Sequence, residues 1–239
     1  VINLAADIAK NNKIHLIGTL HKPIEIEKLS ILLEKFELFC QRVKPNYISL
    51  TADEIIDALS EKRILPYYQP KVDVQNHVVH SVELLARIDA PGNGGVIPPG
   101  RFIKAAEDHD LMDLLTFQML EIAVSEYSEM QSSIQNPFKL ALNLSPNQLE
   151  DLDIPDKLDA MIANVNIQSS QLVIEVTEEH ALISNKQLET LNRLRIKGYG
   201  LSLDDFGTGF TNVNQLLTLP FTEIKIDRSL VSNIHNDLF

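Results

Sequence analysis

The chain of 239 residues is 44% hydrophobic, has no Trp and a single Cys, and carries a formal net charge of −12. Cys40 alone excludes an internal disulfide framework and fits a reducing cytoplasm, and no apolar run reaches the ~18 residues that a membrane span needs. The charge is uneven: residues 1–45 hold seven basic and five acidic side chains, and the rest hold 14 and 28. Residues 46–239 are therefore acidic and are expected to repel the phosphates of DNA. A substrate that carries phosphate would need cations to bridge it to the protein.

Residues 1–41 have the pattern of the end of an α/β domain. Ile14–Leu20 is expected to be a buried strand and Ile24–Phe39 a helix, with Lys22-Pro23 between them. A strand, a Lys-Pro pair and a last helix resemble the C-terminal part of a response-regulator receiver domain, in which this lysine contacts the phosphorylated aspartate. The resemblance implies a sensor histidine kinase as partner. The alternative is an ordinary αβα segment with a solvated Lys22.

Residues 42–53 are expected to be a linker, with Pro45 near its start. Thr51 is followed three residues later by Glu54, the spacing of a capping box. A helix is therefore expected to begin there and to run to Lys62.

From Ile64 onward, strand and helix patterns alternate, which predicts a largely parallel α/β sheet. The expected strands are Leu65–Val74, Val78–Ile88, Lys139–Leu144, Gln171–Thr177, Gly200–Asp204 and Glu223–Ile226. The expected helices are Pro99–Met130, as two helices, then Asp156–Val165, Asn185–Lys197 and Asn212–Leu217. Only Gln75-Asn76-His77 separates the first two strands, which is too short for a crossover, so this pair is expected to be antiparallel.

Polar residues lie near the ends of successive expected strands. These residues are Glu83, Asn143, Glu175, Asp204, Asp205, Lys225 and Asp227. In a β/α barrel the carboxyl ends of the strands meet at one face, which holds the active site. Oxygen ligands suit Mg²⁺ or Mn²⁺, and two such ions can straddle an in-line phosphoryl displacement. The pattern therefore favours a two-metal site.

Several of these residues also have a simpler interpretation. Asp204 and Asp205 suit a solvated turn, and neighbouring strand residues point to opposite faces unless the strand ends there. Asn143 is able to cap a turn, and Glu175 to pair with Lys225 as a buried ion pair. Burial of this many acids without cations or other partners would cost several kcal/mol each, which favours the metal interpretation.

Six motifs, in order from Ile64 to Asp237, together resemble the EAL domain, a family of cyclic di-GMP phosphodiesterases built on a TIM-like barrel with an antiparallel first strand. The motifs are Tyr68-Gln69-Pro70, Glu83-Leu84-Leu85, Asn143-Leu144-Ser145, Glu175-Val176-Thr177-Glu178, Asp204–Gly209 and Lys225-Ile226-Asp227. Leu84 stands where the family name motif has Ala. Since its neighbours match, the change is expected to do little harm.

The resemblance implies that the protein hydrolyses cyclic di-GMP to linear pGpG with two Mg²⁺ or Mn²⁺ ions per site. It also assigns a role to each site residue. Lys225 would orient the attacking water, with Glu83 and Asp205 also catalytic. The substrate would contact Gln69, Arg87 and Asp227, and Glu178 would hold the loop after Asp205 in shape. The metal ligands would be Glu83, Asn143, Glu175, Asp204 and Asp205.

The family continues with a Glu-Gly-Val-Glu strand and a later Gln-Gly-Tyr segment, which do not occur before Phe239. A TIM barrel takes roughly 250 residues, so residues 54–239 are expected to be an EAL domain short of its last strands. The rival functions are a non-catalytic cyclic di-GMP receptor and a signalling scaffold on the same fold. Whether the protein forms a homodimer is left open.

Overall fold

The computed structural model describes residues 17, 18, 20, 24, 26–43, 49–92, 94–133, 137–165, 167–177, 184–207 and 219–232. The chain divides into two compact units, Val1–Ile48 and Ser49–Phe239. In the first unit, α2 (Ile26–Val43) covers most of the segment expected to be helical. Of the strand expected at Ile14–Leu20, only Ile17, Gly18 and Leu20 are described, and they are not in a strand; Lys22 lies outside the described residues.

The second unit begins with α3 (Ala52–Ser60), and its N-terminus confirms the expected capping box. The backbone N–H of Glu54 donates to the Thr51 hydroxyl at 3.3 Å, and the backbone N–H of Thr51 donates to the Glu54 carboxylate at 2.8 Å. Ile55 and Ala58 of this helix are fully buried, which anchors it to the core of the unit.

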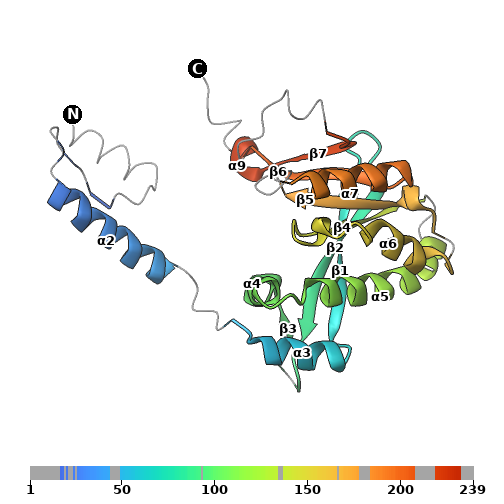
Figure 1. Ribbon diagram of the computed structural model, residues 1–239, viewed down its shortest axis with the longest axis horizontal. Helices are drawn as coiled ribbons and strands as arrows, with labels where there is room; N and C mark the ends of the chain where they lie inside the picture. The colour runs from blue at the N-terminus through green and yellow to red at the C-terminus, as the bar shows by residue number, and fades with distance from the viewer. Residues whose placement is uncertain are drawn as a thin grey trace. The chain divides into compact units, whose positions relative to one another are not determined.

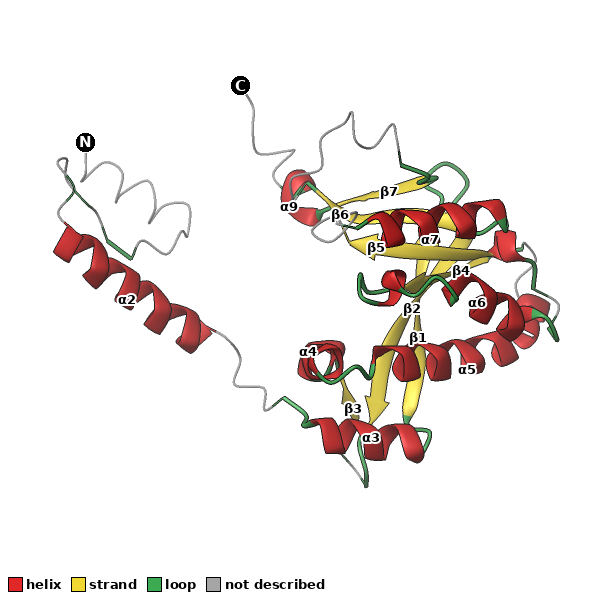
Figure 2. Ribbon diagram, in the orientation of Figure 1, coloured by secondary structure: helices red, strands yellow, loops and turns green. Residues whose placement is uncertain are grey.

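Among the described residues, seven strands form one mixed sheet in the order β1-β2-β4-β5-β6-β7, with β3 beside β2 (Figure 2). They are β1 (Ile64–Val72), β2 (Val79–Asp89), β3 (Val96–Ile97), β4 (Lys139–Asn143), β5 (Leu172–Thr177), β6 (Gly200–Phe206) and β7 (Glu223–Ile226). The β1–β2 pair is antiparallel, as expected, and β2, β4, β5, β6 and β7 pair in parallel. The short strand β3 was not expected.

Helices α5 (Met112–Ser133), α6 (Ile154–Ile162) and α7 (Asn185–Ile196) lie along the outer face of this sheet (Figure 1). The other helices described after α3 are short: η1 (Pro99–Arg101), α4 (Ile103–Asp108), η2 (Gln148–Glu150), η3 (Ser169–Gln171) and α9 (Arg228–Val231). The two helices expected within Pro99–Met130 are α4 and α5, and the helix expected at Asn212–Leu217 lies outside the described residues. No helix in the described ranges is long and apolar enough to cross a membrane.

The two faces of the sheet differ in chemistry because side chains alternate along each strand. Leu84 and Ile88 of β2 are buried in the apolar core with α5, and Glu83 points to the opposite, inner face. The strand registers place the inner-face residues beside one another: Gln69 opposite Glu83, Asn143 beside Glu175, Glu175 beside Ser202 and Ser202 beside Glu223. Polar groups from the whole width of the sheet therefore share one face.

Candidate metal centre

The ammonium group of Lys225 lies among three carboxylates on the inner face. Its Nζ donates to Glu83 Oε2 at 3.0 Å, to Glu175 Oε2 at 2.8 Å and to Asp204 Oδ2 at 2.6 Å. Strands β2, β5, β6 and β7 each supply one of these four side chains. The curvature of the sheet thus brings together residues up to 142 positions apart in the chain.

The same three carboxylates satisfy the geometry of a metal centre. One oxygen from each of Glu83, Glu175 and Asp204 lies within 4.8 Å of the others. Asn143 donates its side-chain N–H to Glu83 Oε1 at 3.0 Å, which places its amide beside the cluster. Hard oxygen donors in this number fit Mg²⁺ or Mn²⁺, so Glu83, Glu175 and Asp204 could hold a divalent ion.

Asp205 shows how two adjacent aspartates reach one site. The backbone φ of Asp205 is +54°, in the left-handed region that residues other than glycine seldom adopt. The pairing of β6 with β7 is also irregular between Leu203 and Phe206. Regular alternation therefore ends there, and Asp204 and Asp205 line the same cavity. Burial raises the pKa of Asp205, and the negative charges of Asp204 and Asp227 raise it further.

Lys71 is a residue of this face that sequence reasoning missed. Its Nζ donates to Glu175 Oε1 at 2.5 Å and to Glu223 Oε1 at 2.8 Å, and Glu223 Oε1 also accepts from the Ser202 hydroxyl at 3.0 Å. Lys71 follows Gln69 by two positions on β1, so inner-face alternation was the available signal. Without knowledge of the strand register, however, a lysine on the first strand of a sheet is expected to be exposed to solvent.

Burial and pairing act in opposite directions on these charges. Burial raises the pKa of Glu175, which is fully enclosed, and hydrogen bonds from Lys225 and Lys71 oppose that rise. Burial alone would lower the pKa of Lys225, but the hydrogen bonds to Asp204, Glu175 and Glu83 outweigh it, and the pKa rises. The lysine therefore keeps its positive charge beside the acids.

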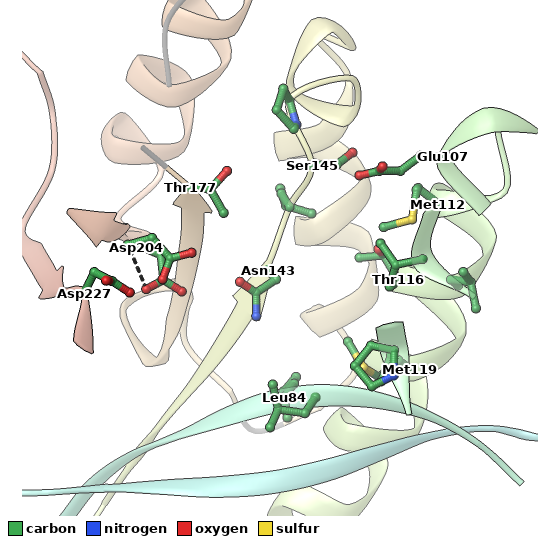
Figure 3. Close-up of a pocket in the computed structure, with 18 residues that line it drawn as sticks. Leu84, Glu107, Met112, Thr116, Met119, Asn143, Ser145, Thr177, Asp204 and Asp227 are labelled. Atoms are coloured by element: carbon green, nitrogen blue, oxygen red, sulfur yellow. Dashed lines mark hydrogen bonds between the residues drawn. The ribbon is translucent and has the colours of Figure 1, made fainter. Parts of the chain in front are cut away.

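A cavity of about 740 Å³ opens beside the cluster at the carboxyl ends of the parallel strands. Figure 3 shows Asp204 and Asp227 at one side of it, Met112, Thr116 and Met119 at the other, and Asn143 between. Aspartates thus stand at one side of a largely apolar hollow, and Glu107 lies with Met112 at the other. That combination suits a ligand with both polar and apolar parts.

The remaining predicted residues are Gln69, Arg87, Asp227 and Glu178. Gln69 faces Glu83 across the β1–β2 ladder. The Arg87 guanidinium lies 5.5 Å from the centre of the Tyr67 ring and donates to Ala86 O at 2.9 Å. Asp227 caps α9 by accepting from the Ser229 N–H at 2.8 Å, and it also lines the cavity. Glu178 lies outside the described residues.

The sequence profile of the EAL domain matches residues 52–238, so the chain belongs to the EAL domain family. The cyclic di-GMP phosphodiesterase RocR of Pseudomonas aeruginosa is 31% identical over 227 residues, which cover 92% of this chain and 57% of RocR. The probable cyclic di-GMP phosphodiesterase PdeG of Escherichia coli is 31% identical over 79% of this chain and 38% of its own length. The chain thus spans little more than half of the one and a smaller share of the other.

Solved structures agree with the mixed sheet and its antiparallel first pair. A structure of PaMucR phosphodiesterase in complex with cyclic di-GMP superposes with a TM-score of 0.70 at 31% identity, over 77% of this chain and 75% of that one. The EAL domain of FimX from Pseudomonas aeruginosa, bound to cyclic di-GMP, gives a TM-score of 0.66 at 23% identity, over 75% of this chain and 72% of that one. At that identity the FimX likeness concerns the fold alone.

Proposed function

We propose that this chain is the phosphodiesterase part of its protein and hydrolyses cyclic di-GMP to linear pGpG with Mg²⁺ or Mn²⁺. The observation that carries the proposal is the cluster of Glu83, Glu175 and Asp204 around Lys225, next to a cavity of about 740 Å³. The names of RocR and PdeG, and the cyclic di-GMP in the PaMucR structure, support the same substrate.

In this proposal Glu83, Asn143, Glu175 and Asp204 hold the first ion, and Asp204 and Asp205 serve the second. Bound divalent ions would supply an activated water and would stabilise charge on the phosphate. Lys225 would orient the attacking water and hold a positive charge near the phosphate, and its hydrogen bonds to Glu83, Glu175 and Asp204 support this role. Glu83 and Asp205 act at the same centre through the ions they hold.

The substrate would lie along the cavity. Gln69 shares the inner face with Glu83. Arg87 lies four positions after Glu83 on the same face of β2, and its planar guanidinium group suits a phosphate. Asp227 stands at the cavity wall. Glu178 is proposed to hold the loop after Asp205 in its competent shape.

The test is hydrolysis of cyclic di-GMP by the purified protein, with product identified by chromatography, in Mn²⁺, in Mg²⁺ and in excess chelator. Turnover that needs the metal and stops in Asp204→Asn supports the proposal. Tight binding of cyclic di-GMP without turnover in any metal would instead identify a receptor, and binding of neither metal nor nucleotide would favour a scaffold. Asp159→Asn, on the outer surface, is the matched control.

The wider setting is also part of this proposal. The match to RocR covers 92% of the chain and so extends beyond the 52–238 EAL region. We propose that residues 1–41 belong to a receiver domain, 42–53 to a linker and 54–239 to the EAL domain, in a cytoplasmic response regulator that a sensor histidine kinase phosphorylates. Phosphotransfer from a kinase to the complete protein, followed with radiolabelled phosphate, would check this.

A further inference from the structure

Two lysines share the carboxylate of Glu175, one at each oxygen. Lys225 donates to Oε2, on the side of Glu83 and Asp204, and Lys71 donates to Oε1 at 2.5 Å on the other side. The Glu175 side chain is fully buried, and the side chain of Lys71 is 18% exposed. The orientation of this carboxylate is therefore set by two cations, of which only Lys225 touches the other acids of the cluster.

Lys71 is itself fixed by a second acid. It donates to Glu223 Oε1 at 2.8 Å, and the buried Ser202 hydroxyl donates to the same oxygen at 3.0 Å. The chain of contacts from Ser202 through Glu223 and Lys71 to Glu175 joins β6, β7, β1 and β5. Strands β1 and β7 stand at opposite ends of the strand order, so this ion pair crosses the inside of the curved sheet.

A divalent ion held by Glu83, Glu175 and Asp204 would compete with Lys225, which donates to one oxygen of each of these residues. Lys71 donates to Oε1 of Glu175, the oxygen that Lys225 does not use. An ion that replaces Lys225 at Oε2 would leave the contact of Lys71 with Oε1 in place. None of Lys71, Glu223 and Ser202 is among the residues that line the cavity.

We propose that Lys71 is a positioning residue for the metal centre, and that it acts by holding the buried Glu175 carboxylate in place through its Glu223 anchor. This inference rests on the proposed function for its kinetic consequence and on the cluster alone for its effect on metal binding. Groups that orient a metal ligand typically change metal affinity or activity 10–100-fold when they are removed.

The test compares four variants by Mn²⁺ calorimetry, by kcat and KM for cyclic di-GMP, and by thermal unfolding. Lys71→Met removes both the charge and the donor, and Lys71→Arg keeps both. Lys71→Met combined with Glu223→Gln restores the charge balance without restoring the donor. Lys197→Met is the matched control, since Lys197 also bridges two carboxylates, Asp156 and Asp159, but on the outer surface.

Lys71→Met is expected to weaken Mn²⁺ binding and lower kcat by at least about tenfold, with KM within about threefold. The double variant should stay impaired, Lys71→Arg should recover most of the loss, and Lys197→Met should bind Mn²⁺ like the parent. Should Lys71→Met fail to fold, the double variant and Lys71→Arg still decide the question.

Unchanged or tighter Mn²⁺ binding in Lys71→Met, or full recovery in the double variant, would overturn the inference, because Lys71 would then act by net charge or not at all. The Mn²⁺ affinity measured by calorimetry does not depend on which nucleotide is the substrate. A parent protein that binds Mn²⁺ but leaves cyclic di-GMP intact would sink the proposed function and still test Lys71. A parent that binds no Mn²⁺ would sink this inference as well.

Discussion

Two charge clusters of similar geometry occur in the second unit, one inside the curved sheet and one on its outer surface. Inside, Lys225 lies 2.6–3.0 Å from Asp204, Glu175 and Glu83. Outside, between α6 and α7, Lys197 lies 2.8 Å from Asp156 and 2.5 Å from Asp159, and Arg193 lies 2.9 Å from Asp156. The distances barely differ, but the Glu175 side chain is 0% exposed and that of Asp156 is 55% exposed.

The difference teaches that burial and charge balance distinguish a candidate site from an ordinary surface network. The outer cluster has two acids and two basic groups, in contact with water. The inner cluster has four carboxylates, counting Glu223, against two ammonium groups, so negative charge remains uncompensated where water screens it poorly. A divalent ion would balance the excess negative charge inside the sheet. The outer cluster has no excess negative charge for such an ion to balance.

The largest expected effect is that of Lys225→Met, which leaves three carboxylates facing one another. In metal-free protein the free energy of unfolding should fall by about 3–5 kcal/mol, the usual cost when one partner of a buried pair is removed. Mn²⁺ should restore much of this stability, because an ion that binds only the folded state stabilises it. Urea unfolding with chelator and with Mn²⁺ measures both.

The same variant should lose turnover far more than substrate binding. A residue that orients the attacking water typically contributes about 10²–10⁴-fold in rate, so kcat and kcat/KM should fall together. A rise in KM alone would make Lys225 a binding residue. A loss of stability that Mn²⁺ leaves unchanged would contradict the view that the acids around Lys225 form a cation site.

Asp204→Asn should have the next largest effect. Asparagine keeps the size of the side chain and one oxygen but removes the charge, so Mn²⁺ binding should weaken by at least about tenfold, or 1.4 kcal/mol. The metal-free protein should tolerate this change better than Lys225→Met, since it relieves repulsion among the acids. Calorimetry on Asp204→Asn and on the surface control Asp159→Asn makes the comparison, and equal affinities in the two variants would contradict it.

Most of the strands and helices of the second unit could be predicted, because each rests on a local pattern. The antiparallel first pair followed from a three-residue connection, and the start of α3 from the spacing of Thr51 and Glu54. Strand β3 has two residues, Val96–Ile97, which is too short to show any periodicity. For the first unit, the predicted receiver resemblance stays a prediction.

The polar residues of the site could be predicted as a set, but not their contacts. Convergence of strand ends brings Glu83, Glu175, Asp204 and Lys225 together in the structure, but their roles remain proposals. The positive φ of Asp205 comes from a local irregularity that no residue pattern shows. The role of Lys71 depends on partners 104 and 152 positions away, and only the register of the whole sheet supplies that information.

The smallest expected effect is that of Asp156→Asn in the outer cluster. Hydrogen bonding to Lys197, with a contribution from Arg193, holds the pKa of Asp156 below its ordinary value. A carboxyl whose pKa is lower in the folded state than in the unfolded chain adds stability above the unfolded pKa, about 3.9 for Asp, and loses it as the pH falls through the folded value. The melting temperature of the variant should therefore lie slightly below that of the parent at pH 7, by no more than about 2–4 °C.

That small gap should close only as the pH falls below about 3.9. It should also shrink in about 0.5 M salt at pH 7, because exposed charges are screened within a few ångströms at such ionic strength. The effect of Lys225→Met should change less in the same salt, since the inner charges are partly or fully buried and salt screens such pairs much less than exposed ones. Melting curves of both variants at low and high salt therefore test the comparison directly. Equal salt sensitivity would show that the inner cluster is as open to solvent as the outer one, and the argument for a cation site from burial would fail.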